Sequence, residues 1–236
     1  MKGKCAIVTG AGGGIGAATA RRLASAGAEL VLVGRDARAL EAVEAQIRVD
    51  GGVASHVVAD VTRQDEVERA AAHALEEHGA IDLLVNNAGV VAVGNVADFP
   101  VEDWDRIFDV NVRGVFLFTR SVLHSMLAQG SGHVINIASV AARVGFPGWA
   151  AYSASKAAVA QFSRALLEEV RGHGIRVTVL YPGGVDSPLW DRFPNDFNRG
   201  RMLTQSDVAE AVFYAASQPA TVLVDEISLV YPLGNQ

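Results

Sequence analysis

The segment C-A-I-V-T-G-A-G-G-G-I-G, residues Cys5–Gly16, decides the fold of this chain. Its apolar start predicts a buried strand, and its glycines predict a tight turn into a helix. Gly10 permits the turn, Gly14 lets the backbone approach a ligand, and Gly16 lets the helix pack near the strand. Amides at the start of such a helix suit a pyrophosphate, so the segment predicts a dinucleotide site. The predicted residues of this loop are Gly10, Gly12, Gly13, Gly14, Ile15 and Gly16.

The remainder of the chain alternates between short apolar runs and longer segments with helical periodicity. Runs rich in Val and Ile that alternate with helices are typical of a parallel sheet covered on both faces. Strands are predicted at Cys5–Val8, Leu30–Val33, His56–Ala59, Leu83–Val85, Val134–Ile137, Arg176–Leu180 and Ile227–Val230. Helices are predicted at Ile15–Ala26, Ala37–Val49, Gln64–His78, Val101–Leu127, Ala150–Arg171 and Ser206–Ser217. The fold class is therefore α/β, and residues 1–236 are expected to form one domain.

Composition excludes several classes of protein. Half of the residues are hydrophobic and only 19% are charged, which indicates that some apolar surface is hidden against partner subunits. The net charge of −6 argues against a nucleic-acid partner. The single Cys5 excludes an intramolecular disulfide, and the histidines lack metal-binding spacing. No leader or membrane-spanning run is evident, so a cytoplasmic protein is expected.

A second segment, from Ser139 to Lys156, carries the chemistry. It places a hydroxyl after the apolar run H-V-I-N-I-A, and then Tyr152 and Lys156 four residues apart. On a helix these two side chains share one face. A phenol has a pKa of about 10, and an adjacent ammonium favours the phenolate and lowers that pKa. The pair thus predicts an acid/base for an alcohol or carbonyl oxygen, although Y-x-x-x-K alone is also compatible with a solvent-facing turn.

Five motifs occur together in a characteristic order. These are T-G-x₃-G-x-G, N-N-A-G at Asn86–Gly89, Ser139, Y-x-x-x-K at Tyr152–Lys156, and P-G at Pro182–Gly183. In order and spacing they resemble the short-chain dehydrogenase/reductase family over essentially the whole chain. The resemblance implies a three-layer Rossmann fold, a seven-stranded parallel sheet with helices on both faces, and NAD(P) bound across the strand ends.

The end of the second strand bears on the choice of coenzyme. An acidic residue there binds the ribose 2′-hydroxyl of NAD, but this chain has Gly34 followed by Arg35. An arginine pairs with a 2′-phosphate through several donors, which favours NADP as the cofactor. NAD is the alternative, with Arg35 solvated and Asp36 as the hydroxyl ligand; Asp36 is also a plausible helix cap. The glycine loop lacks the extra basic residue that many relatives using NADP carry.

Other cofactor contacts are implied by the resemblance. Asp60 and Val61 match the adenine-binding pair, with a helix cap as the alternative role for Asp60. The N-N-A-G segment would line the coenzyme through Asn87, Ala88 and Gly89. The segment after the sixth strand would contact the nicotinamide carboxamide. Its implied residues are Pro182, Gly183, Val185 and Ser187, the last replacing a more frequent Thr.

The resemblance also implies a mechanism. Ser139 orients the substrate oxygen and Tyr152 gives or takes its proton. Lys156 lowers the phenol pKa and binds the nicotinamide ribose, while Asn111 holds a water that links Lys156 to solvent. Taken alone, Asn111 is more often a polar residue in helix packing. Tyr152 and Lys156 are therefore expected both to bind the coenzyme and to take part in catalysis.

The substrate pocket is expected between Val140–Trp149 and Ser187–Met202, the latter within the irregular stretch from Pro182 to Met202, and it suits a compact carbonyl or alcohol. Its predicted residues are Ser139, Val140, Phe146, Trp149, Leu189 and Trp190, with Phe193 as a further candidate. Arg143 and Arg192 are candidates to meet a substrate carboxylate, and the alternative for each is a solvated side chain. The C-terminal segments resemble the NADP-dependent 3-hydroxy acid dehydrogenase-like branch. The alternatives are a 3-oxoacyl-carrier-type reductase and a regulatory protein that senses NADP without catalysis.

Overall fold

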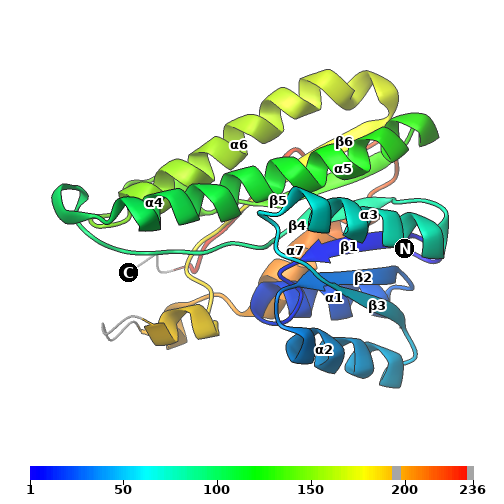
Figure 1. Cartoon of the computed structure of the whole chain (residues 1–236), viewed down its shortest axis with the longest axis horizontal. Helices are drawn as coiled ribbons and strands as arrows, with labels where there is room; N and C mark the ends of the chain where they lie inside the picture. Colours follow the sequence, from blue (N-terminus) through cyan, green and yellow to red (C-terminus); the bar gives the residue numbers. More distant parts are fainter. Residues whose placement is uncertain (193–197, 233–236) are drawn as a thin grey trace.

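A seven-stranded sheet forms the centre of the molecule in the computed structural model, which describes residues 1–192 and 198–232 (Figure 1). All neighbouring strands are parallel, in the order β3-β2-β1-β4-β5-β6-β7. The strands are β1 (Cys5–Thr9), β2 (Glu29–Gly34), β3 (Val53–Val58), β4 (Leu83–Asn86), β5 (Gly132–Ile137), β6 (Ile175–Pro182) and β7 (Glu226–Leu229). The predicted seven-stranded parallel sheet is confirmed.

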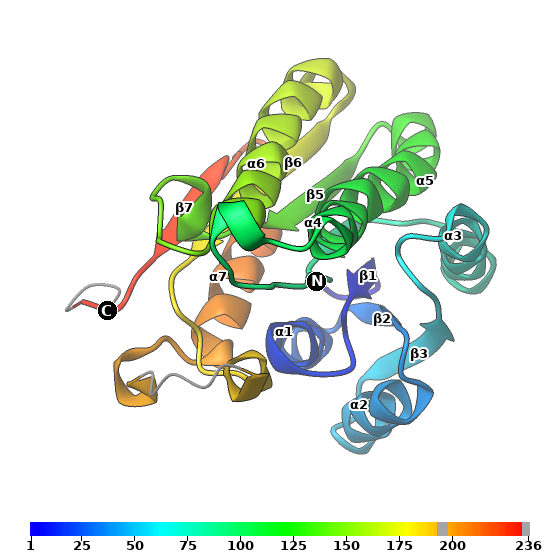
Figure 2. The ribbon, with the colours of Figure 1, turned by 60° about the vertical axis from the view of Figure 1, so that its left-hand side comes forward.

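Helices cover both faces of this sheet, which completes the predicted three-layer arrangement (Figure 2). The helices are α1 (Gly14–Ser25), α2 (Ala37–Val49), α3 (Gln64–His78), α4 (Val101–Phe108), α5 (Gly114–Gln129), α6 (Ala150–Val170) and α7 (Gln205–Ser217). One core cluster joins the sheet to α1, α2 and α7. A second cluster joins the opposite face to α3, α5 and α6.

The strand sequences explain why both faces are covered. Successive side chains of a strand point to opposite faces, so a strand buried on both sides must be apolar throughout. In β1, Ala6 and Val8 belong to the core under α1, whereas Cys5 and Ile7 belong to the core under α3. β2 divides its residues in the same alternating way. The continuous apolar runs in the sequence therefore report a doubly covered sheet.

The strand order reverses beside β1, which pairs with β2 on one side and β4 on the other. In sheets of this type ligands bind at that reversal, beyond the carboxyl ends of the strands. Side chains and backbone hold the two loops together there. Thr9 Oγ1 accepts hydrogen bonds from the amides of Asn87 and Ala88, both at 3.0 Å, and Asn87 Nδ2 donates to Thr9 O at 2.9 Å.

One predicted helix is wrong as an uninterrupted element. The segment expected at Val101–Leu127 is divided into α4 and α5 by a π-helical turn at Asp109–Arg113. Hydrophobic periodicity does not register such a turn, because it adds a single residue to an otherwise continuous helix. π-Turns inside helices occur frequently at functional sites, and this one contains Asn111. Within the described residues, no helix combines the length and apolarity needed to cross a membrane.

Candidate active site

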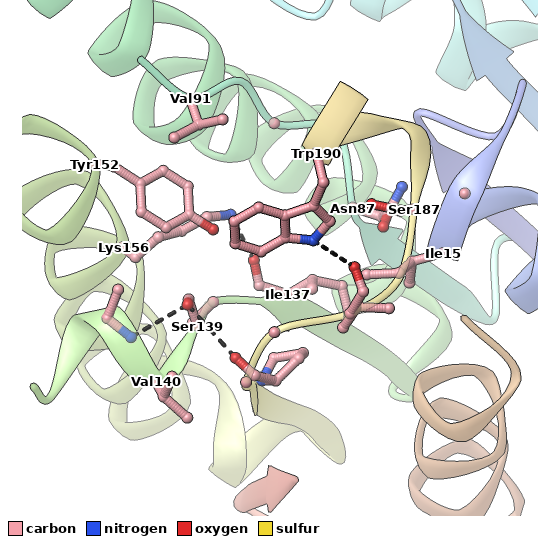
Figure 3. Close-up of a pocket in the computed structure, with 18 of the residues that line it drawn as sticks. Ile15, Asn87, Val91, Ile137, Ser139, Val140, Tyr152, Lys156, Ser187 and Trp190 are labelled. Atoms are coloured by element: carbon pink, nitrogen blue, oxygen red, sulfur yellow. Dashed lines mark hydrogen bonds between the residues drawn. The ribbon is translucent and has the colours of Figure 1, made fainter. Parts of the chain in front are cut away.

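A cleft of about 620 Å³ lies at the carboxyl ends of the strands (Figure 3). Its walls are the glycine loop after β1, the loop after β4, the end of β5, the start of α6 and the segment after β6. The lining residues that the sequence predicted are Gly13, Gly14, Ile15, Arg35, Asn87, Gly89, Ser139, Val140, Phe146, Trp149, Tyr152, Lys156, Pro182, Gly183, Val185, Ser187 and Trp190. Residues distant in the sequence therefore share one cleft.

Three of the four predicted catalytic residues, Ser139, Tyr152 and Lys156, line this cleft directly. Ser139 follows β5 and Tyr152 and Lys156 lie on the first turns of α6, so both groups reach the same strand end. Ser139 Oγ accepts a hydrogen bond from the Ala141 amide at 3.1 Å and lies 3.4 Å from the carbonyl oxygen of Pro182, to which it donates. Its hydroxyl also interacts with the phenol of Tyr152, an interaction that lowers the pKa of that phenol.

Burial decides the protonation of the two titratable groups. Removal from water raises the pKa of the Tyr152 phenol, and the interaction with Ser139 opposes this only in part. The same desolvation lowers the pKa of the Lys156 ammonium to about 8. Desolvation therefore outweighs the lowering of the phenol pKa that the sequence predicted from Lys156, and the net shift is upward. The Lys156 nitrogen lies 5.8 Å from the centre of the phenol ring.

Asn111, the fourth predicted catalytic residue, lies behind the cleft wall in the π-helical turn and is fully buried. Its Oδ1 accepts from the Val90 amide at 2.8 Å, and its Nδ2 donates to Val90 O at 2.9 Å and to Ser155 Oγ at 3.0 Å. A Cβ atom on Gly89 would lie 3.4 Å from Asn111 Oδ1 and 3.5 Å from Lys156 Nζ. The absence of a side chain at Gly89 thus leaves space beside both groups.

The glycine loop has the close approaches that its spacing predicts. Gly10 and Gly14 have positive φ angles of +66° and +55°, which side chains rarely adopt. A Cβ on Gly16 would lie 2.2 Å from Gly10 O, so only glycine lets α1 start this near β1. A Cβ on Gly12 would lie 3.1 Å from the Cβ of Ala39 on α2. At Gly13 nothing lies within 4 Å of that position.

The end of β2 separates the roles of two neighbouring charges. Asp36 caps α2, because its carboxylate accepts a hydrogen bond from the Ala39 amide at 3.1 Å. Arg35 is exposed and lines the cleft, and none of the hydrogen bonds or ion pairs among the described residues involves it. Gly34 packs against the side chain of Leu40 instead of facing the cleft. The basic residue therefore faces the cleft while the acidic one serves the helix.

Known proteins resemble this chain over nearly its full length. The sequence model of the short chain dehydrogenases matches residues 4–197. The chain belongs to the short-chain dehydrogenase/reductase family. An uncharacterized oxidoreductase of Staphylococcus saprophyticus is 40% identical over 230 residues, 97% of each protein. This confirms the predicted family and its oxidoreductase class.

Two solved structures extend the comparison to three dimensions. A metagenomic short-chain oxidoreductase in complex with NADP is 34% identical, with a TM-score of 0.86 over 97% of this chain and 96% of that one. A variant of actinorhodin polyketide ketoreductase with NADPH is 33% identical, with a TM-score of 0.91 over 99% of this chain and 98% of that one. The short-chain dehydrogenase fold is therefore shared throughout.

Some predicted residues of this short-chain dehydrogenase/reductase are not in the cleft lining. Asp60 Oδ1 accepts from the amide and the hydroxyl of Thr62, both at 2.9 Å, and Val61 packs its buried side chain against Gly114. Asp60 does not cap α3 either, because Arg63 is the residue at that position. The predicted residues outside the lining are Gly10, Gly12, Gly16, Gly34, Asp60, Val61, Ala88 and Asn111.

Arg143 does not face the cleft of the short-chain dehydrogenase/reductase, so its predicted contact with a substrate carboxylate is wrong. Its guanidinium pairs with Glu226, donates to Ser228 Oγ at 3.0 Å and covers the ring of Tyr181 at 3.5 Å. Glu226 also receives Arg164 at 2.8 Å. A nearby carboxylate thus neutralises Arg143, and a single sequence cannot reveal a partner 83 residues away.

The substrate end of the cleft is aromatic. Val140, Phe146, Trp149 and Trp190 line it as predicted. The side chains of Leu189 and Arg192, and the whole of Phe193, lie outside what the structure describes. Arg201 and Met202, within the predicted range Ser187–Met202, also line the cleft, whereas sequence reasoning missed Val90 and Val91. Val90 and Val91 are the two residues after N-N-A-G, and that position is the signal that would have found them.

Proposed function

We propose that this chain is an NADP(H)-dependent oxidoreductase that transfers a hydride between the nicotinamide and a small secondary alcohol or carbonyl compound. The observation that supports this most is the meeting of Ser139, Tyr152 and Lys156 in one cleft with the glycine loop. A nucleotide sensor has no need for an acid/base beside its ligand. The alternative of a non-catalytic, NADP-sensing regulatory protein is therefore disfavoured.

The cleft residues fit a dinucleotide. Helix α1 begins at Gly14 with no side-chain cap and no acidic residue in its first turn, so its free amides suit a pyrophosphate. A Cβ on Gly13 or Gly14 would enter open space, which marks a cradle that a side chain would fill. Arg35 supplies positive charge where a 2′-phosphate would lie, and Asp36 is engaged as a helix cap. These contacts favour NADP over NAD, and both solved relatives named above were determined with NADP or NADPH.

The remaining coenzyme residues follow from their place in the lining. Asn87 and Gly89 would flank the nicotinamide half, and Pro182, Gly183, Val185 and Ser187 would face its carboxamide. Asp60 and Val61 stay proposals for the adenine end, although one carboxylate oxygen of Asp60 already accepts two hydrogen bonds within its own turn. When bound, the coenzyme supplies or accepts the hydride.

The chain's own residues manage the proton. Ser139 orients the substrate oxygen beside Tyr152 and interacts with the phenol. Because burial raises the phenol pKa, Tyr152 is protonated at neutral pH and is set up to donate to a carbonyl oxygen. Lys156, when charged, stabilises the phenolate that remains. Asn111 and its Val90 contacts hold the space through which a water connects Lys156 with solvent. The site therefore suits carbonyl reduction.

Two narrower substrate classes stay open within this proposal. Arg201 in the cleft lining favours a 3-hydroxy acid, because a guanidinium pairs with a carboxylate. The similarity to a polyketide ketoreductase favours a 3-oxoacyl-carrier-type reductase. A homo-oligomer, dimer or tetramer, is supported by exposed apolar side chains on α4 and α5, Trp104, Phe116 and Leu127.

Tyr152→Phe tests the proposal, since it removes one hydroxyl and keeps the ring. Turnover of NADPH with a panel of aldehydes, ketones and 3-oxo acids should fall by about 100-fold or more, the usual loss for an acid/base. NADPH affinity, measured by fluorescence titration, should stay nearly unchanged. The control is Tyr214→Phe, a change at an exposed tyrosine on α7. Equal turnover in Tyr152→Phe and wild type, or tight NADPH binding with no turnover by wild type, would reject an enzyme of this kind.

A further inference from the structure

Three aromatic rings form a continuous wall that starts at the reactive hydroxyl. Trp149 meets Tyr152 edge to face, with ring centres 5.6 Å apart and an interplanar angle of 76°. Trp149 also packs against Trp190, with centres 5.9 Å apart and planes tilted by 48°. Both indoles line the cleft, and Figure 3 shows Trp190 in it together with Tyr152 and Val91. We call Tyr152, Trp149 and Trp190 the aromatic wall.

The wall is held in place by polar contacts. Trp190 Nε1 donates a hydrogen bond to the main-chain oxygen of Val185 at 2.7 Å, which fixes the indole relative to the end of β6. Trp149 precedes α6 directly, and its carbonyl accepts the Ser153 amide at 2.8 Å. Aromatic rings ordered before a ligand arrives contribute contact area at little entropic cost. The wall is therefore a preformed surface for a flat group.

Several other described side chains at this end of the cleft are apolar as well. These lining residues are Val91, Val140, Phe146 and Met202. Among the described lining residues the cations are Arg35, Lys156 and Arg201. Arg35 belongs to the coenzyme end, Lys156 donates to Ile137 O, and Arg201 lies in an exposed turn. A carboxylate placed against the aromatic wall would lose its water without gaining a charge partner from the wall.

We propose that the cleft selects carbonyl compounds with a flat aryl substituent on the carbonyl carbon, such as aryl methyl ketones. This rests on the proposed function and names its substrate class. The aryl ring packs on Trp149 and Trp190, which places the carbonyl oxygen between Ser139 and Tyr152. The carbonyl π bond breaks as a hydride from NADPH forms the new C–H bond and the Tyr152 proton forms the O–H bond. The ketone is reduced to a secondary alcohol, NADPH is oxidised to NADP, and solvent restores the tyrosine proton.

A comparison of two ketones of similar size tests this class. Acetophenone carries a flat ring, and cyclohexyl methyl ketone carries a puckered ring without a π system. Because an aromatic pair adds a few-fold to about ten-fold in binding, wild-type kcat/KM should be about 3- to 10-fold higher for acetophenone. Trp190→Leu should bring that ratio close to one. Trp190→Phe, which keeps a flat ring, should restore most of the preference.

The matched control is Trp104→Phe, the third tryptophan, which stacks on Phe108 outside the cleft lining and should leave the ratio unchanged. A wild-type ratio near one, or a ratio that persists in Trp190→Leu, would overturn the aryl preference alone. The aryl preference would also be overturned if wild type reduced acetoacetate but not acetophenone, and if Arg201→Ala lost the reduction of acetoacetate. That result would favour a 3-hydroxy acid as the product. If wild type reduces no carbonyl compound, the proposed function itself fails and the substrate class falls with it.

Discussion

The ammonium nitrogen of Lys156 lies 2.8 Å from the main-chain oxygen of Ile137, at the last residue of β5. Lys156 is 5% exposed, and among the described residues no carboxylate pairs with it. A carbonyl dipole compensates only part of the lost hydration of a charge. That imbalance explains why burial lowers the pKa of Lys156 to about 8.

The first prediction concerns the pH dependence of ketone reduction. A lysine with a pKa of about 8 is charged below that pH and progressively neutral above it. The phenolate formed on Tyr152 needs the positive charge, so kcat/KM should decline above about pH 8. The pH profile of kcat/KM reports the pKa values of the enzyme before substrate binds, so the midpoint of this decline gives the pKa of Lys156. Lys156→Arg should move the decline to higher pH, because a guanidinium stays protonated. If the decline of kcat/KM in Lys156→Arg occurs at the same pH as in wild type, a group other than Lys156 causes it.

The second prediction concerns Arg35 and the choice of coenzyme. Arg35→Ala should raise the Kd of NADPH by about 10-fold or more, since a charge-assisted hydrogen bond contributes roughly 1.5–3 kcal/mol. The Kd of NADH should change little, because NADH lacks the 2′-phosphate. Isothermal titration with each coenzyme measures both effects. Arg38→Ala is the control, an exposed arginine on α2 outside the cleft lining. Equal losses for NADPH and NADH would mean that Arg35 does not read the phosphate.

Strand positions followed from the sequence because the strands are buried on both faces. Every residue of β1 is buried, so the apolar run C-A-I-V identified it. The edge strand β3 was harder to locate in the sequence, and it begins at Val53, three residues before the predicted start. Its end residues Val53 and Val58 are exposed, and Ser55 and His56 interrupt the apolar run. Local pattern reports burial, and burial is weakest at the edge of a sheet.

The candidate site was predictable where backbone shape or local spacing decides it. Gly16 and the Tyr152–Lys156 pair are of that kind. Long-range electrostatics was not predictable: Arg143 finds its partner in Glu226, on the last strand. Neither was the sign of the Tyr152 pKa shift, which depends on how much water the cleft excludes. Charge partners and desolvation come from the assembled structure.

The third prediction separates folding from coenzyme binding within the glycine loop. A Cβ on Gly16 would lie 2.2 Å from Gly10 O and 2.6 Å from Asn87 Nδ2, and a backbone oxygen cannot rotate away. Gly16→Ala should therefore lower the free energy of unfolding by about 3 kcal/mol or more, at or above the usual range for overpacking. Urea denaturation followed by circular dichroism measures this loss.

Gly13→Ala is the matched change, because Gly13 lines the cleft, has an extended φ of −176°, and has nothing within 4 Å of a new Cβ. Its unfolding midpoint should stay close to that of wild type. Its affinity for NADPH should fall, since the methyl group would project into the cradle at the start of α1. If Gly13→Ala instead unfolds as readily as Gly16→Ala, or binds NADPH as wild type does, then the amides at this helix start do not hold the pyrophosphate.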